Sequence, residues 1–212
     1  MRKLLAIFAF VAVTLSIPSL AYEEPAFSAV AFADGIEYRQ YEPYLVAETI
    51  VPGSVARDKA ANIAFRRLFD YISGANTVDQ KIQMTTPVRQ EAVSTRLDMT
   101  TPVRQEPGPD GWSVAFIVPS GFDAASAPEP TNPAVYIREV PAERVAVVRY
   151  SGRWTDGNIE RHRQVLLDGL AAAGVTPSGE VVTAFYNAPF SLPPLRRNEV
   201  MVRINDFPTS EG

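Results

Sequence analysis

Apolar residues recur at three- and four-residue spacing in two stretches of the chain, and each stretch predicts a helix with one buried face. The first helix is expected over Arg57–Ser73, with Gly74 as its C-terminal stop, and the second over Asp156–Ala173, with Thr155 or Asp156 as N-cap. The apolar positions that define the two faces are Ala61, Ala64, Phe65, Leu68, Phe69 and Ile72 in the first helix and Ile159, Leu166, Leu170 and Ala173 in the second.

Shorter runs rich in β-branched and aromatic residues predict strands before and after each helix. A pair of strands precedes each helix, and the short connection inside each pair contains a proline, so we expect each pair to form a β-hairpin. The expected strands are Ile36–Tyr41, Tyr44–Val51, Thr85–Gln90 and Trp112–Pro119 in the first half, and Val135–Val140, Arg144–Tyr150, Val181–Asn187 and Glu199–Ile204 in the second.

The two halves of the chain match at an offset of 99 residues, which places Tyr38-Arg39-Gln40 on Ile137-Arg138-Glu139 and the first helical pattern on the second. An older duplication explains this match. The strands are therefore expected to form one antiparallel sheet that curves around, with the two helices covering its faces or ends.

A perfect octapeptide repeat, MTTPVRQE, occurs at Met84–Glu91 and again at Met99–Glu106. Each copy predicts a short extended segment, and because proline cannot donate to a β-ladder, Pro87 and Pro102 belong at a strand start, a bulge or an edge. This favours an irregular rim over the middle of a sheet. The alternative is a tandem duplication that lengthens a loop without functional gain.

The first residues have the features of a secretory signal peptide. Arg2 and Lys3 precede a short apolar run, and Ser19-Leu20-Ala21 places small residues where a signal peptidase reads them, so cleavage is expected after Ala21. The alternative is an uncleaved membrane anchor, for which the apolar run is short. We expect an exported, periplasmic product with residues 1–21 removed.

The mature chain is mildly acidic and has no cysteine. Removal of residues 1–21 takes away two basic and no acidic residues, so the formal charge moves from −4 to −6. This disfavours binding to nucleic acid or to an anionic membrane surface. Stability must come from a hydrophobic core without disulfides, and thiolate chemistry is excluded.

Candidate chemistry is sparse in this sequence. The single histidine, His162, lies between two arginines on or beside the apolar face of the second expected helix, where it is either a hydrogen-bonded structural residue or a ligand. Carboxylates on the expected strands could face inward as acids or cation partners, or outward into solvent, and strand alternation does not decide between these. They are Glu48, Glu139, Glu143 and Glu199.

Two loops stand out by their composition. Ser120–Pro133 is rich in Ala, Pro and Ser and is expected to be a connector. Asn187–Pro194 holds the apolar Phe190 and Leu192 between prolines, so it packs against the core or forms a stiff pocket wall.

Several segments together resemble the SOUL haem-binding protein family. The resemblance covers Gly35 to Ile204, almost the whole mature chain. The matching segments are Lys81–Val88, with the pattern K-I-x-M-T-x-P-V, then Arg196-Arg197-Asn198-Glu199-Val200, Tyr44–Glu48, Ala64–Leu68 and Tyr150–Trp154.

The resemblance implies an α+β fold in which two βαββ-type repeats form a distorted antiparallel β-barrel flanked by two helices, similar to multidrug-effector-binding domains. It divides the chain into a signal peptide (1–21), an N-terminal extension (22–34), the domain itself (35–205) and a C-terminal tail (206–212).

The resemblance also implies binding of haem or another porphyrin against the first helix, mainly through apolar contacts and without strong axial ligation. The expected binding residues are Phe65, Arg66, Arg67, Leu68, Phe69 and His162, the last as an optional iron ligand. The sequence departs from the family at Asn62 and Asp70, where relatives carry basic residues, so Arg66 and Arg67 are the nearest cations for the propionates.

Two function classes remain open from the sequence. The first is a periplasmic tetrapyrrole carrier or buffer with a small hydrophobic ligand, no nucleic-acid partner and no stable membrane anchor. The second is a general small-molecule binding domain of the multidrug-effector type, or an enzyme derived from one, that uses an inward strand carboxylate such as Glu199. The sequence does not fix the oligomeric state.

Overall fold

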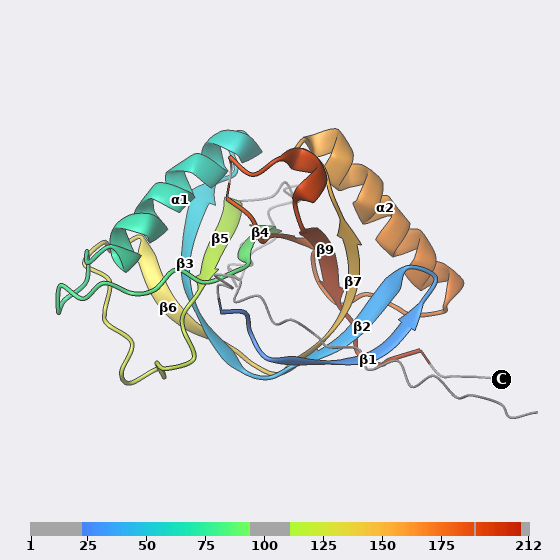
Figure 1. Cartoon of the computed structure of the whole chain (residues 1–212), viewed down its shortest axis with the longest axis horizontal. Helices are drawn as coiled ribbons and strands as arrows, with labels where there is room; N and C mark the ends of the chain where they lie inside the picture. The colour runs from blue at the N-terminus through green and yellow to red at the C-terminus, as the bar shows by residue number, and fades with distance from the viewer. Residues whose placement is uncertain (1–22, 94–110, 189, 209–212) are drawn as a thin grey trace, which may run out of the picture.

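The computed structural model describes residues 23–93, 111–188 and 190–208 as one curled antiparallel sheet with two helices on its outer side (Figure 1). The second copy of the octapeptide and the expected signal peptide lie outside the described residues. The elements are β1 (Phe27–Ala33), β2 (Ile36–Tyr41), β3 (Tyr44–Pro52), α1 (Arg57–Ile72), β4 (Val88–Val93), β5 (Gly111–Ile117), β6 (Val135–Val140), β7 (Glu143–Tyr150), α2 (Asp156–Ala172), β8 (Val182–Phe185), η1 (Pro193–Leu195) and β9 (Asn198–Arg203).

The strand order confirms the two related halves. The order is β1-β2-β7-β9-β8-β4-β5-β3-β6. If each element of the first half is exchanged for its counterpart in the second, β2 for β6, β3 for β7, β4 for β8 and β5 for β9, the order from β2 to β6 reads the same backwards. A pseudo-two-fold axis therefore passes between β4 and β8. The expected α+β fold is present, and its distorted antiparallel barrel is an open half-barrel with β1 and β6 as its end strands.

The predicted hairpins are wrong. Strand β2 pairs with β7, and β3 pairs with β6, so each expected pair is split between the two halves. A two-residue hairpin needs positive φ in its turn, but proline fixes φ near −65°, so Glu42-Pro43 cannot form such a turn. Asp34-Gly35, with φ of 51° and 81°, does form one and joins β1 to β2. The expected N-terminal extension thus supplies an edge strand.

Both helices form where the apolar spacing places them. In α2, the hydroxyl of Thr155 accepts from the backbone N–H of Asn158 (3.3 Å), which identifies Thr155 as the N-cap. The apolar face of α1 is rotated from the predicted one, because Ala60 and Tyr71 are buried whereas Phe69 is 47% exposed. The sheet therefore covers only part of the apolar face that the sequence predicted for α1.

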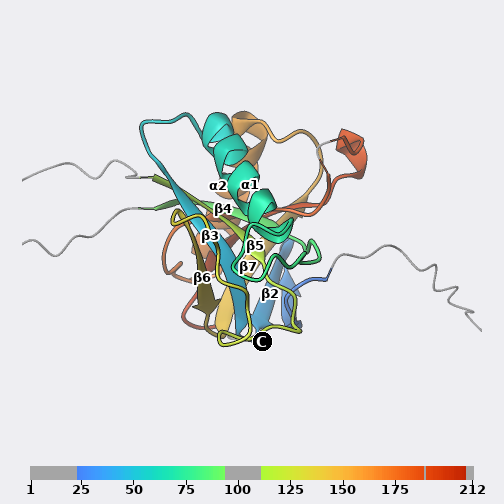
Figure 2. The ribbon, with the colours of Figure 1, turned by 90° about the vertical axis from the view of Figure 1, so that its left-hand side faces the viewer.

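The two faces of the sheet carry different cores. The outer face packs against the helices in two separate hydrophobic clusters, one under α1 and one under α2. The inner face carries two smaller apolar clusters and, between them, many charged side chains. Figure 2 shows α1 lying across the strands it covers. In the described part of the chain, no helix has the length and hydrophobicity needed to cross a bilayer.

The first copy of the octapeptide leads into β4. Pro87 directly precedes the strand, which confirms the prediction of a strand start, and the peptide bond between Thr86 and Pro87 is cis. The predicted rim position is wrong for this copy, since β4 lies in the middle of the sheet between β8 and β5. Proline is tolerated there because it stands before the ladder begins.

Candidate functional site

The helix residues expected to bind a ligand point in different directions from α1. Each residue turns the helix by about 100°, so Arg67 lies roughly 200° around from Phe65. Arg67 faces β3, where its guanidinium donates to the hydroxyl of Thr49 (3.2 Å) and to the carbonyl of Ile50 (3.3 Å). Leu68 is fully buried in the core under the helix. The structure therefore separates Arg67 and Leu68 from the aromatic residues.

Phe65, Phe69 and Arg66 share one flank of α1. The two rings stack with their centroids 6.0 Å apart and an angle of 13° between their planes. Phe65 is held in place by an edge-on contact with Phe116 of β5, at 5.3 Å between centroids, while nearly half of Phe69 is exposed. Arg66 is exposed and lies three residues before Phe69, at the spacing that brings side chains together on a helix.

His162 lies on α2, in the other half of the molecule. Its ring stacks on Tyr150, with centroids 4.2 Å apart, and its Nδ1 is 2.7 Å from the carbonyl oxygen of Asn158. A carbonyl only accepts, so Nδ1 carries the proton and donates this bond. Both contacts are those of a structural histidine.

The two helices begin close together and then diverge (Figure 1). Their first residues are joined by a hydrogen bond from Arg57 to Asp156 (2.5 Å). At about 1.5 Å per residue, His162 lies roughly 9 Å along α2 and Phe69 roughly 18 Å along α1. The structure therefore does not bring His162 to the aromatic pair.

Glu199, the carboxylate singled out from the sequence, faces inward but is fully engaged. It is 0% exposed and accepts from Arg39 (2.8 and 3.0 Å), from the hydroxyl of Tyr186 (2.6 Å) and from Arg197 (3.0 Å). Burial alone would raise its pKa, but the hydrogen bonds and charge of Arg39, helped by Tyr186 and Arg197, outweigh burial and lower it. Glu199 is thus an ionised structural carboxylate.

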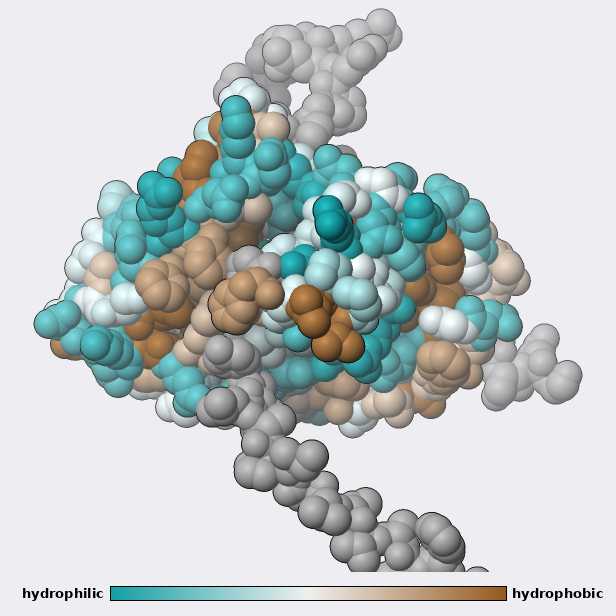
Figure 3. All heavy atoms as spheres, turned by 45° about the horizontal axis from the view of Figure 1, so that its top comes forward, coloured by the Kyte–Doolittle hydropathy of each residue, from teal (hydrophilic) through white to brown (hydrophobic). Residues whose placement is uncertain are grey.

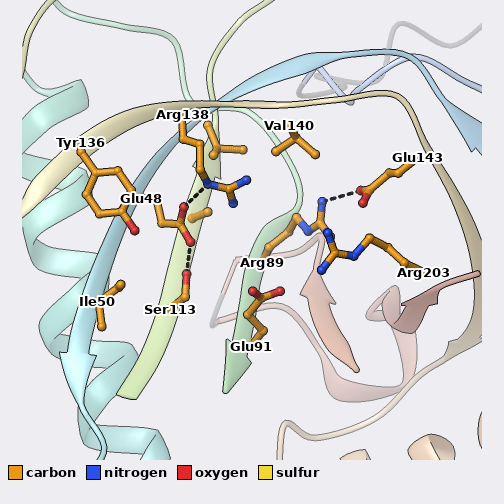
Figure 4. A pocket seen from close by; sticks show the side chains of 12 residues that line it. Glu48, Ile50, Arg89, Glu91, Ser113, Tyr136, Arg138, Val140, Glu143 and Arg203 are labelled. Atoms are coloured by element: carbon orange, nitrogen blue, oxygen red, sulfur yellow. Dashed lines mark hydrogen bonds and ion pairs between the residues drawn. The ribbon is translucent and has the colours of Figure 1, made fainter. Parts of the chain in front are cut away.

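Other charged residues line a cavity of about 240 Å³ on the inner face of the sheet (Figure 4). At one end Glu48 accepts from Arg138 Nε (2.5 Å) and from the hydroxyl of Ser113. Burial, followed by the charge of Glu48, raises the pKa of the adjacent Tyr136 to about 12. This end of the cavity is a closed network of paired groups.

The other end of the cavity holds a second ion pair. Arg89 donates to Glu143 (3.1 Å), and the hydroxyl of Tyr44 donates to the same carboxylate oxygen (3.1 Å). Arg89 and Glu143 are both largely buried. Of the four carboxylates that the sequence left undecided, three face inward and are paired, whereas Glu139 is exposed.

Two further side chains of the cavity were missed from the sequence. Glu91 and Arg203 both line it, and among the described residues neither has a hydrogen bond or ion pair to another side chain. Burial raises the pKa of Glu91, against the opposing charges of Arg89, Arg203 and Arg138. The expected strand ended at Gln90, three residues before the observed end of β4 at Val93, although strand alternation from Arg89 places Glu91 on the same face.

A second hollow, of about 470 Å³, lies between the segment 23–26, the loop after β5 and the start of β3. Its floor is apolar, and its charged lining residues are Glu23, Glu24, Asp123 and Glu139. No basic residue lines it among those described. Neither hollow includes a residue of α1.

The loop between β8 and β9 exposes apolar side chains. Phe190 is 90% exposed, and Leu192 and Leu195 are also largely exposed. The loop is fixed to the connection before α2 by a hydrogen bond from Gly152 N–H to the carbonyl of Pro193 (2.9 Å). Figure 3 shows separate apolar patches, in brown and tan, among hydrophilic residues in teal.

Solved structures share this fold at low sequence identity. The C-terminal domain of EcmrR superposes with a TM-score of 0.59 at 9% identity, over 81% of this chain and 98% of that one. An uncharacterised conserved protein from Listeria innocua gives 0.54 at 9%, over 80% and 92%. A hydrolase from the same organism gives 0.52 at 8%, over 82% and 94%. These likenesses concern the fold alone.

No curated protein matches the sequence closely enough to report. The family comparison is specific: residues 22–203 match SOUL heme-binding protein. That range runs from the expected mature N-terminus to the last residue of β9 and includes α1, the octapeptide and the β8–β9 loop. The chain therefore belongs to the SOUL heme-binding protein family.

Proposed function

We propose that the protein binds a tetrapyrrole on the exposed flank of α1 formed by Phe65, Phe69 and Arg66. The observation that carries the proposal is the stacked pair Phe65 and Phe69, half open to solvent with an unburied arginine beside it, in a chain of a heme-binding family. A flat apolar macrocycle fits against aromatic rings, and a guanidinium pairs with a propionate through two parallel hydrogen bonds.

The two hollows suit a porphyrin less well than this flank does. The inner cavity, at about 240 Å³, is below the roughly 300–1,000 Å³ of typical ligand pockets and is lined by ion pairs. The second hollow is large enough, but its carboxylates would repel the propionates. The flank of α1 combines apolar rings with positive charge.

Iron ligation plays no part in this proposal. His162 stacks on Tyr150 and points its Nδ1 proton at its own helix, away from the aromatic pair. Bound haem would supply its own iron and its visible absorption, and the chain would supply the apolar surface and the cation. Affinity for haem and for iron-free porphyrin should then be similar.

The expected export signal gives the proposal its setting. A periplasmic protein that holds a porphyrin on a surface flank, without a strong axial bond, can release it to a partner, as a carrier or buffer must. An enclosed, iron-ligated site would favour retention instead.

The proposal is tested by titrating the mature protein with haemin and with iron-free protoporphyrin IX. We expect a Soret shift with haemin, quenching of protein fluorescence with both, and dissociation constants that agree within about threefold. His162→Ala should leave both constants unchanged. Absence of binding, or binding that needs both iron and His162, would contradict the proposal.

A further inference from the structure

We propose that the inner cavity is a second binding site, for a small zwitterion whose cationic group faces Glu91 and whose carboxylate faces Arg203. The site lies on the opposite face of the sheet from α1 and does not depend on tetrapyrrole binding. The proposal rests on the cavity itself and on which of its charges are already neutralised (Figure 4).

The charges of the cavity divide into closed pairs and open groups. Glu48 is bonded to Arg138, and Arg89 to Glu143, at 2.5 and 3.1 Å. Glu91 and Arg203 are left, one negative and one positive, with no such bond among the described residues. A ligand of a single charge would satisfy one of them and leave the other unpaired. A zwitterion satisfies both and leaves the cavity neutral.

Burial distinguishes the roles of the two groups. Glu91 is half-buried inside the cavity, and burial raises its pKa even though the charges of Arg89, Arg203 and Arg138 act against this shift, so its carboxylate gains from a cation in direct contact. Arg203 is exposed at the rim, where it can meet a carboxylate without a large loss of hydration. The ligand's cationic end would therefore enter first.

The register of the sheet sets the length of the ligand. Gln90 of β4 pairs with Thr183 of β8, and Thr183 pairs with Val200 of β9, so Arg203 lies two strands and two residues away from Glu91. These steps correspond to about 10 Å across the sheet and about 7 Å along it. Both are long side chains directed into the same cavity, which shortens the gap between their charged ends. A zwitterion with several bonds between its charges suits this gap better than a compact α-amino acid.

The volume of the cavity limits the size of the ligand. A space of about 240 Å³ holds a molecule smaller than a typical drug and excludes a porphyrin. The apolar part of the lining comes from Val46, Ala115 and Val140 on β3, β5 and β6. The ligand class is thus a short aliphatic chain with an ammonium group at one end and a carboxylate at the other.

The first test is calorimetric titration of the mature protein with γ-aminobutyrate, glycine, butyrate and n-butylammonium. We expect γ-aminobutyrate to bind at least tenfold more tightly than each of the other three. Equal affinity for n-butylammonium would assign the cavity to cations, and absence of heat with γ-aminobutyrate would remove the site. Either outcome overturns the proposal.

Variants then locate the site. Glu91→Gln and Arg203→Gln should each weaken γ-aminobutyrate binding by at least tenfold, whereas Glu139→Gln and Arg161→Gln, which change exposed charges outside the cavity, should not. Arg203 is exposed, so its variant keeps the fold even if Glu91→Gln does not. Phe69→Ala should leave this binding intact, which separates the cavity from the flank of α1. Unchanged affinity in Arg203→Gln would overturn the assignment.

Discussion

Two carboxylates on the inner face of the sheet have pKa values shifted in opposite directions. Glu199 is held ionised by Arg39, Tyr186 and Arg197, while Glu91 is half-buried without a bonded cation. Both carboxylates face inward from the same sheet, so the difference in their pKa values comes from their bonded partners and not from their orientation.

The first prediction concerns Glu199. Replacement of Glu199 by alanine leaves the buried guanidinium of Arg39 with Glu37 as its carboxylate partner and removes the acceptor of the Tyr186 hydroxyl, and should lower the free energy of unfolding by about 3 kcal/mol. Because its folded pKa lies below the ordinary 4.5, the stability it provides is complete above that value and lost as the pH falls through the folded pKa. Urea denaturation at pH 7 and pH 4 measures both effects. A loss below 1 kcal/mol at pH 7 would be inconsistent with the network.

The second prediction concerns Glu91, whose folded pKa is raised. The contribution of Glu91 to stability is fully present below the ordinary pKa of 4.5, where its carboxyl group is protonated, and is lost as the pH rises through the folded pKa. Glu91→Gln should therefore stabilise the ligand-free protein at pH 7 by up to about 1 kcal/mol, with a smaller gain at pH 4. Glu139→Gln, at an exposed position, serves as control. A variant less stable at pH 7 than at pH 4, relative to wild type, would refute this.

Sequence reasoning placed the aromatic residues of α1 correctly on a helix but could not resolve its rotation. The apolar pattern is wider than the surface that the sheet covers, so Phe65 and Phe69 fall at its edge and Leu68 at its centre. The direction of Arg67 depends on Thr49 and Ile50, which are distant in sequence. Such contacts have no periodic signal.

At the scale of elements, the residues in each turn decide which neighbouring strands form a hairpin. Composition predicts the positions of the strands but not their pairing, because β2 and β3 each pair with a strand of the other half and not with each other. Asp34-Gly35 is a strong hairpin signal, and both residues have positive φ, whereas Glu42-Pro43 lacks residues that adopt positive φ. The 99-residue repeat indicates two related halves, and the strand pairs β2–β7 and β3–β6 join one half to the other.

The third prediction concerns the octapeptide repeat. Deletion of residues 92–106 leaves one MTTPVRQE, followed by Pro107-Gly108-Pro109-Asp110 and then β5, and the P-D-G sequence favours a tight turn. Pairing of Val88 with Phe116 and of Glu91 with Ser113 can be kept. Because loop closure costs only about 0.6 kcal/mol per doubling of length, we expect the free energy of unfolding to change by about 1 kcal/mol or less.

Thermal and urea unfolding of the deletion variant measure this change. Deletion of residues 84–98 gives the same sequence, so one protein tests both copies. Loss of cooperative unfolding would show that the second copy is needed for the fold.

At the scale of the whole molecule, the sheet separates two chemical environments. The outer face carries the helices and the aromatic flank, and the inner face carries charged pairs around a small cavity. The sequence predicted the fold class through its internal repeat and its family resemblance. It did not predict the cavity, because the six charges that line it come from five different strands.

The fourth prediction concerns export. A mature N-terminus at Tyr22 is expected, since the small residues Ser19 and Ala21 follow a short apolar run. Intact mass of the protein recovered from the periplasmic fraction measures this directly. A full-length chain that sediments with membranes would contradict it.

The central claim, that a porphyrin lies on the flank of α1, is tested most directly by comparing two variants of that helix. Phe69 and Ile63 are both exposed, at 47% and 40%, but only Phe69 lies on the aromatic flank. Phe69→Ala should weaken iron-free protoporphyrin binding about fivefold or more, since an aromatic contact contributes about 1 kcal/mol beyond its area, while Ile63→Ala should leave it unchanged. Equal affinities in wild type and both variants would place the porphyrin elsewhere and contradict the account.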